Sequence, residues 1–78
     1  MNIRDAVIQI IVEALGVEPG AISDESNLKD NLGAGSPQLL EMALAIEELF
    51  LFGISDRALG KLYTVGDVVA YVKNKTES

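Results

Sequence analysis

The chain has 78 residues and carries twelve acidic against six basic side chains, a formal net charge of −6. This charge argues against nucleic acid or an anionic membrane surface as partner, because such surfaces are bound mainly through Lys and Arg. Histidine and cysteine are both absent. Their absence excludes disulfides, imidazole or thiolate metal ligands and the usual groups of hydrolytic catalysis. We therefore expect no enzyme and no metal site, and a basic protein surface as partner.

Hydrophobic residues make up 49% of the chain and charged residues 23%, so the sequence can bury a core. At this length we expect a single domain over residues 1–78. The apolar stretch at residues 6–15 is interrupted by Gln9 and Glu13, which is typical of neither a signal peptide nor a membrane span. We expect a cytoplasmic, monomeric protein.

The first predicted helix runs from about Ile3 to Leu15. Asn2 can cap its start, and Gly16 is placed to end it. Apolar residues within it recur at intervals of three and four, the spacing of one buried stripe. They are Ile3, Val7, Ile10, Ile11 and Ala14.

Residues 17–35 form a long connection rich in Pro, Gly, Ser, Asn and Asp. A connection of this length in so small a domain is usually functional or partly helical. We expect a helical turn near Pro19 to Ile22 and a loop that Leu28 and Leu32 anchor to the core.

The second helix is predicted from Ser36, whose hydroxyl can act as the N-cap, to about Leu51. Pro37 follows at a position where a missing N–H costs nothing. A short third helix is expected from Ser55 to Leu59, with Gly60 closing it.

The last helix is predicted to begin after Thr64, with Asp67 three residues later as a weaker form of the capping box. A strand over residues 65–72 is the alternative, since valine favours strands, but spacings of three and four favour a helix. The predicted fold is all-α. It is a small, irregular four-helix bundle of three main helices and one short helix, with the long loop between the first two.

The second helix has two apolar faces. At 100° per residue, one face should pack on the core. On the other side, Leu40 and Leu44 lie one turn apart among acids and should contact water. Scattered exposed leucines are ordinary, but this pattern also fits a docking surface. The core face comprises Leu39, Met42, Ala43, Ile46, Leu49 and Phe50, and the outer side Pro37, Leu40, Leu44 and Leu51 with Glu41, Glu47 and Glu48.

A divalent cation between Glu41 and Glu48 is a weaker interpretation of the same helix. The two carboxylates project in similar directions. They lie two turns apart, roughly 10 Å along the axis, which is too far for both to bind one ion directly.

The segment Leu32-Gly33-Ala34-Gly35-Ser36 places a hydroxyl at the positive end of a helix, after two glycines that let the backbone turn. A phosphate attached there would be stabilised, with the amides of Gln38 and Leu39 left to contact it. The alternative is that Ser36 only caps the helix. No Lys follows the glycines as in a Walker loop, and no His activates the serine. Any chemistry at Ser36 is therefore done by another enzyme.

These segments resemble the acyl carrier proteins. The resemblance lies in Leu32-Gly33-Ala34-Gly35-Ser36 followed by Leu40-Glu41, in residues 45–50 (AIEELF) and in Gly53-Ile54-Ser55-Asp56. Leu15-Gly16-Val17 and Tyr63-Thr64-Val65 extend it over nearly the whole chain.

The resemblance implies that Ser36, with Gly35 and Pro37 beside it, carries a covalent 4′-phosphopantetheine arm, which would make the chain a phosphoprotein. A phosphopantetheinyl transferase would add the arm from coenzyme A, and acyl groups of fatty-acid, lipid or polyketide-type synthesis would be held as thioesters. The resemblance also implies that Glu41, Glu47, Glu48 and Asp56 meet basic patches on acyl-processing enzymes. Helical spacing adds Leu40 and Leu44 to the same docking surface. The acyl chain would be lined by Ala43, Ile46, Ile54, Leu59, Leu62 and Val68.

The chain departs from the family pattern around the serine. Gly35 stands where the family commonly has Asp, Pro37 where it has Leu, and Gln38 where a further acid is frequent. These departures suggest a specialised carrier with its own partners. The alternatives are an interaction domain that is never modified and an aminoacyl or peptidyl carrier.

Overall fold

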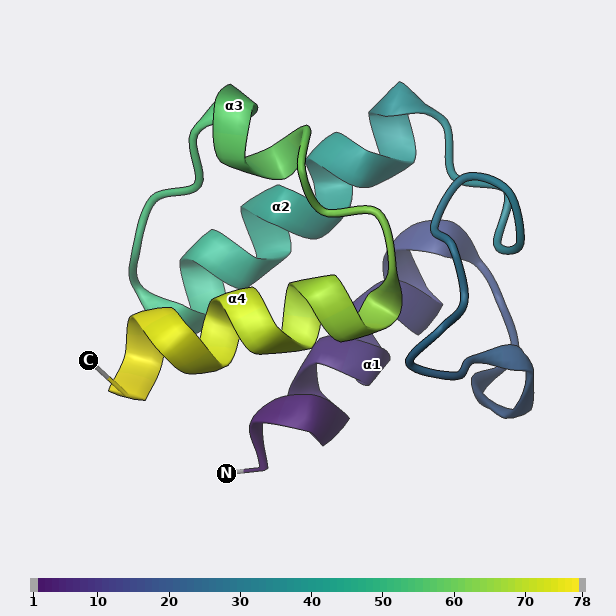
Figure 1. The fold of residues 1–78 in the computed structure, drawn as a ribbon, viewed down its shortest axis with the longest axis horizontal. Helices are drawn as coiled ribbons and strands as arrows, with labels where there is room; N and C mark the ends of the chain where they lie inside the picture. Colours follow the sequence, from purple (N-terminus) through teal and green to yellow (C-terminus); the bar gives the residue numbers. More distant parts are fainter. Residues whose placement is uncertain (1, 78) are drawn as a thin grey trace.

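The computed structural model describes residues 2–77, and within them the chain folds into four α-helices and one 3₁₀ turn. The described residues form no strand, only an isolated antiparallel bridge between Asn27 and Thr64. The all-α prediction is therefore confirmed, including the helix over residues 65–72 where a strand was the alternative. The elements are α1 (Ile3–Leu15), η1 (Pro19–Ala21), α2 (Ser36–Phe50), α3 (Asp56–Leu59) and α4 (Val65–Glu77), shown in Figure 1.

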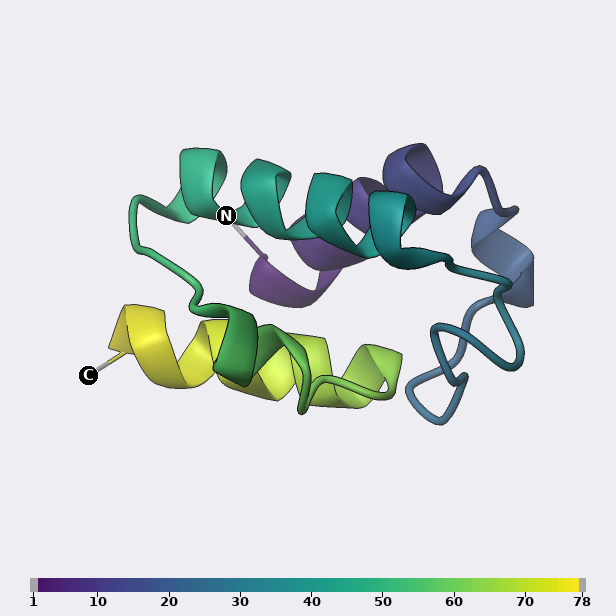
Figure 2. The ribbon, with the colours of Figure 1, turned by 90° about the horizontal axis from the view of Figure 1, so that it is seen from above.

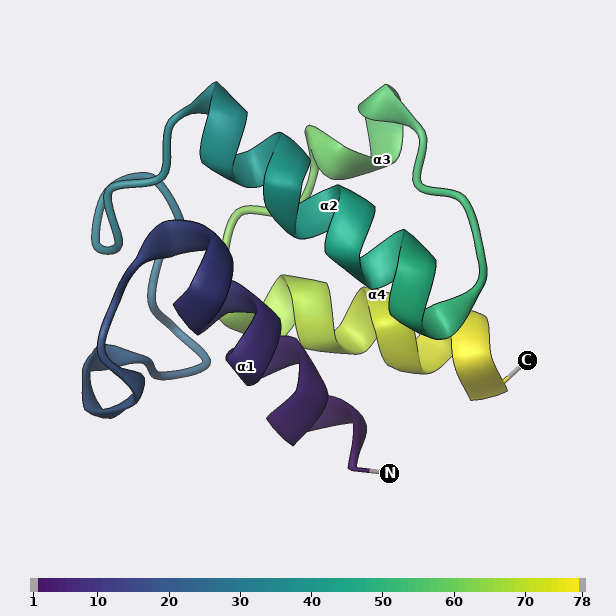
Figure 3. The ribbon, with the colours of Figure 1, turned by 180° about the vertical axis from the view of Figure 1, so that it is seen from behind.

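The core lies where α1 packs against both α2 and α4. Figure 2 shows α2 and α4 on opposite sides of the molecule, and Figure 3 shows α1 in front of α4. Each fully buried aliphatic side chain contributes about 1.5–3 kcal/mol relative to exposure. The completely buried side chains are Val7, Ile11, Leu28, Met42, Ile46, Val65, Val68 and Val72.

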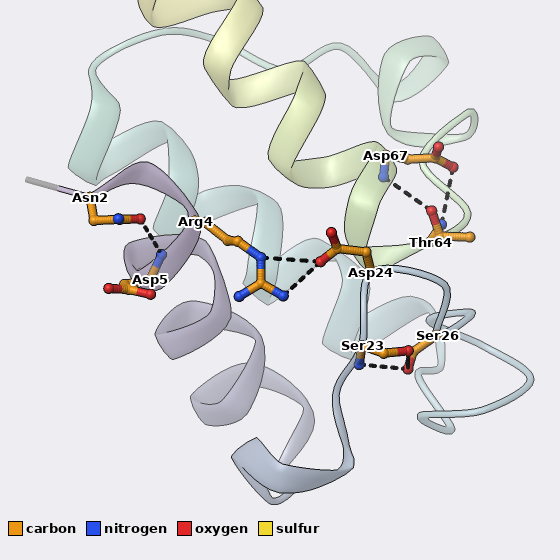
Figure 4. Close-up of polar contacts among 8 residues, drawn as sticks. All are labelled: Asn2, Arg4, Asp5, Ser23, Asp24, Ser26, Thr64 and Asp67. Atoms are coloured by element: carbon orange, nitrogen blue, oxygen red, sulfur yellow. Dashed lines mark hydrogen bonds and ion pairs between the residues drawn. The ribbon is translucent and has the colours of Figure 1, made fainter.

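The predicted caps of α1 and α4 are confirmed (Figure 4). The side chain of Asn2 accepts a hydrogen bond from the Asp5 N–H at 3.1 Å. Gly16 ends α1 in the left-handed region at φ 68°, which glycine adopts without a Cβ penalty. At the start of α4, the Asp67 N–H donates to the Thr64 hydroxyl at 3.0 Å, and the Thr64 N–H donates to the Asp67 carboxylate at 3.1 Å.

The long connection, residues 17–35, is tied to the start of α4 by backbone hydrogen bonds. Leu28 donates to the carbonyl of Tyr63 at 2.8 Å, and Gly66 donates to the carbonyl of Asp24 at 2.8 Å. Leu28 is buried and Leu32 is nearly so, which confirms both as anchors. The 3₁₀ turn η1 falls within the predicted region.

The segment between α2 and α3 is held in place by contacts with α2 and with α4. The Glu47 carboxylate on α2 accepts a hydrogen bond from the Ile54 N–H at 2.6 Å. Phe52 packs its ring against Tyr71 of α4, with the ring centroids 6.1 Å apart. Helix α3 begins at Asp56, one residue later than expected, because Ser55 is its N-cap. The Ser55 hydroxyl accepts a hydrogen bond from the Ala58 N–H at 3.0 Å.

Helix α2 ends at Phe50, within one residue of the expected end, and Leu51 is its C-cap residue in the left-handed region at φ 60°. One expectation about α2 is corrected. Leu49, assigned to the core face from its position on the helix, is 44% exposed. It lies at one border of the predicted apolar arc and in the last turn of the helix, so the core covers only part of its side chain.

A substitution at Gly66 tests the close contact between α4 and the long connection. A Cβ added there would lie 3.0 Å from the carbonyl oxygen of Asp24, a backbone atom that cannot rotate away. We expect Gly66→Ala to lower the free energy of unfolding by about 1–3 kcal/mol, although alanine favours helices. Urea unfolding followed by circular dichroism measures this change.

Gly20→Ala is the matched control, because nothing lies within 4 Å of its added Cβ. It should leave the free energy of unfolding unchanged or raise it by less than about 1 kcal/mol. Equal stability of the two variants would contradict the assigned contact.

Candidate functional site

Ser36 is the first residue of α2 and is exposed. The N-cap is Gly35, whose N–H donates to the side-chain oxygen of Gln38 at 3.0 Å. The prediction that the Ser36 hydroxyl caps α2 is therefore wrong. A hydroxyl caps from the residue before the helix, and Ser36 lies one position too late. Among residues 2–77, its hydroxyl has no hydrogen-bond partner.

The backbone amides near this hydroxyl also differ from the expectation. The first helical bond of α2 runs from the Leu39 N–H to the Gly35 carbonyl at 3.0 Å, so Leu39 is already satisfied. Pro37 has no N–H. The amides of Ser36 and Gln38 come before the first helical bond and therefore remain for a group attached at Ser36.

A pocket of about 210 Å³ opens beside Ser36, between the loop, the start of α2, and α3 with the segment that follows it. Its lining combines leucines with polar and charged residues, as is common in ligand-binding pockets. Lys29 supplies the basic group and Asp56 the acidic group. The lining residues are Asn27, Leu28, Lys29, Ser36, Leu39, Asp56, Leu59, Gly60, Leu62 and Tyr63.

Of the six residues expected to line an acyl chain, Leu59 and Leu62 lie in this pocket. Ala43, Ile46 and Val68 are buried in the core, and Ile54 is half-buried. Lys29 and Asn27 were not predicted at the site, and Tyr63 entered only through the family resemblance. Lys29 could have been noticed in the sequence, because it is the single basic residue between positions 5 and 56.

The outer side of α2 presents exposed apolar and acidic side chains together. Leu40 is 53% and Leu44 is 50% exposed, as their helical positions predicted. Glu41 and Glu48 are exposed beside them. Glu47 differs, because it is half-buried and its carboxylate is engaged by the Ile54 N–H. We define the outer face as Leu40, Glu41, Leu44 and Glu48.

Within residues 2–77, no group of three or more acidic side chains is placed to hold a metal ion. None of the described helices is both long and apolar enough to cross a bilayer.

Comparison with known proteins defines the class of this fold and site. Residues 5–72 match the family model described as a phosphopantetheine attachment site. The chain is also 40% identical over 75 residues to the acyl carrier protein of Chlamydia caviae, covering 96% of this chain and 97% of that protein. The acyl carrier protein of Wolinella succinogenes is 40% identical over 73 residues, covering 94% and 96%. That of Bdellovibrio bacteriovorus is 43% identical over 75 residues, covering 96% of each.

The chain therefore belongs to the acyl carrier protein family. It is a carrier and not an enzyme, and its cofactor is covalently attached 4′-phosphopantetheine. The residues at the start of α2 fit this group. An exposed hydroxyl without a hydrogen-bond partner is available for attachment, and a partly apolar pocket lies beside it.

Because Ser36 caps nothing, we expect Ser36→Ala to change the free energy of unfolding of the unmodified protein by less than about 0.5 kcal/mol. Chemical unfolding of the purified variant measures this. Ser55→Ala is the matched control, because its hydroxyl does cap α3, and it should cost about 1 kcal/mol. A cost at Ser36 as large as that at Ser55 would contradict the geometry at α2.

Proposed function

We propose that Ser36 is the attachment site of the phosphopantetheine arm. The observation that carries the proposal is its exposed hydroxyl, which lacks a hydrogen-bond partner among residues 2–77 and lies beside the pocket. In the transfer, a bond forms between Ser36 Oγ and the phosphorus of coenzyme A that bears the pantetheine. The bond from that phosphorus to the 3′,5′-ADP portion breaks, and the transferase takes the hydroxyl proton.

The arm ends in a thiol, which supplies the nucleophile that this cysteine-free chain lacks. We propose that it holds acyl intermediates of fatty-acid, lipid or polyketide-type synthesis as thioesters. A short acyl group fits the existing pocket beside Leu59 and Leu62. A longer one reaches Ala43, Ile46 and Val68 only if the bundle opens, because these side chains are already buried. Ile54 completes the proposed lining.

We further propose one carrier domain over residues 1–78, working as a monomer in the cytoplasm. A phosphopantetheinyl transferase and acyl-processing enzymes are its proposed partners. They would contact the outer face, with Asp56 beside Ser36 in the pocket. Glu47 supports this surface indirectly, since its carboxylate holds the link to α3.

The attachment is tested by incubating the protein with coenzyme A, Mg²⁺ and a phosphopantetheinyl transferase. We expect intact-mass spectrometry to show the addition of one arm to the wild type and none to Ser36→Ala. Ser55→Ala, also at a helix start, should be modified like the wild type. An arm on Ser36→Ala, or a wild type left bare by several transferases, would refute the attachment site. Intact mass of protein from its own cells would also distinguish acyl from aminoacyl or peptidyl cargo.

The outer face is tested by Leu40→Glu. A carboxylate at this position would have to lose its hydration inside an apolar partner surface. We expect the KM for modification by the transferase to rise about tenfold or more, equivalent to ~1.4 kcal/mol of binding. Thermal unfolding should change little, since Leu40 is half-exposed.

Ala70→Glu on α4 is the control for that experiment, because it adds the same charge at an exposed position on another helix. Its KM should stay near the wild-type value. If both variants had the same KM, the effect would be one of net charge, and the outer face would not be the docking surface.

A further inference from the structure

Lys29 stands out in the charge pattern of the chain. It is the single basic residue between positions 5 and 56, and all of the chain's acidic residues except Asp67 and Glu77 lie in that stretch. Lys29 nevertheless lines the same pocket as Ser36. The net charge of the chain does not account for a basic residue at this pocket in an otherwise acidic region.

The backbone at Lys29 is fixed on both sides. Its N–H donates to the side-chain oxygen of Asn27 at 2.9 Å, and its carbonyl accepts from the Gly33 N–H at 3.1 Å. The preceding residue, Leu28, is buried. The turn therefore fixes the backbone of Lys29 at the edge of the pocket, and Lys29 is exposed there.

The Lys29 ammonium forms no ion pair with any residue among 2–77. Asp56, the acidic residue of the pocket lining, is not bonded to it. A lysine that lines a pocket and has no carboxylate partner is available to bind an anion that enters the pocket. The amides of Ser36 and Gln38, which precede the first helical bond of α2, are further donors at the start of that helix.

We propose that Lys29 is the binding residue for the phosphodiester of the arm, and that it holds the arm along the pocket between the loop and α3. The assignment rests on the proposed attachment at Ser36, which brings one negative charge to the pocket that Lys29 lines. Lys29 thereby positions the arm when it carries no cargo, and the interaction is electrostatic and sensitive to salt.

The test uses the modified protein without cargo, as wild type, Lys29→Gln and Lys29→Arg. We expect the ³¹P resonance of the phosphodiester to move in Lys29→Gln and to stay near the wild-type position in Lys29→Arg, which keeps the charge. The difference between wild type and Lys29→Gln should shrink at about 1 M salt, where the screening length is about 3 Å. The Lys29 side-chain ¹³Cε resonance should also shift when the unmodified wild type acquires the arm.

Lys73→Gln is the matched control, because Lys73 is exposed on α4 and does not line the pocket. Its ³¹P resonance should coincide with that of the wild type. Coincident ³¹P resonances in Lys29→Gln and the wild type, or an unchanged ¹³Cε resonance of Lys29, would overturn the proposal.

Two other outcomes have distinct meanings. An effect of Lys29→Gln that emerged only after loading with a carboxylate-bearing acyl group would place the anion on the cargo and overturn the assignment to the phosphodiester. Failure of the wild type to take up any arm would instead refute the attachment at Ser36, and the proposal for Lys29 would fall with it.

Discussion

The hydrogen-bonded junction between residues 17–35 and the start of α4 determines where Ser36 and the pocket beside it lie. Backbone carbonyls of Asp24 and Ser26 accept hydrogen bonds from the first residues of α4, and Leu28 is buried beneath them. These bonds satisfy amides that a helix start leaves free. They also fix a loop that would otherwise be costly to order. Since the same loop leads directly into Ser36, the capping of one helix sets the position of the hydroxyl at the start of another.

Helix α2 divides its residues between the buried core and the proposed docking surface. Met42 and Ile46 are completely buried, so they contribute to the core. Leu40 and Leu44 are about half-exposed and therefore contribute less to the free energy of folding. Glu47 lies between these roles, because its carboxylate fixes the link to α3 and so one wall of the pocket. A substitution at Glu47 would therefore change the pocket as well as the surface charge, whereas Glu41 and Glu48 can be changed more independently.

Local patterns predicted most of the fold. Asn2, Thr64 and Asp67 were recognisable as caps because capping depends on residue type and spacing over three or four positions, and Leu28 was recognisable as an apolar anchor in a polar loop. Three features required the tertiary structure. The exposure of Leu49 depends on what packs beside it, and the hydrogen bond from the Ile54 N–H to the Glu47 carboxylate joins residues seven positions apart. Ser36 was predicted as the N-cap, but the N-cap is Gly35, one residue earlier, and its N–H is bonded to the Gln38 side chain.

This one-residue difference decides whether the Ser36 hydroxyl is occupied by a capping hydrogen bond. Had Ser36 been the N-cap, its hydroxyl would be occupied, and modification would cost the helix a stabilising hydrogen bond of about 1 kcal/mol. With Gln38 bonded to the Gly35 N–H instead, an arm can be added at Ser36 without removing any interaction that holds α2. A side chain at position 35 would crowd this arrangement, since a Cβ there lies 3.0 Å from the Gln38 side-chain oxygen. The hydrogen bond between the Gly35 N–H and the Gln38 side chain thus leaves the Ser36 hydroxyl without a partner, as the proposed attachment requires.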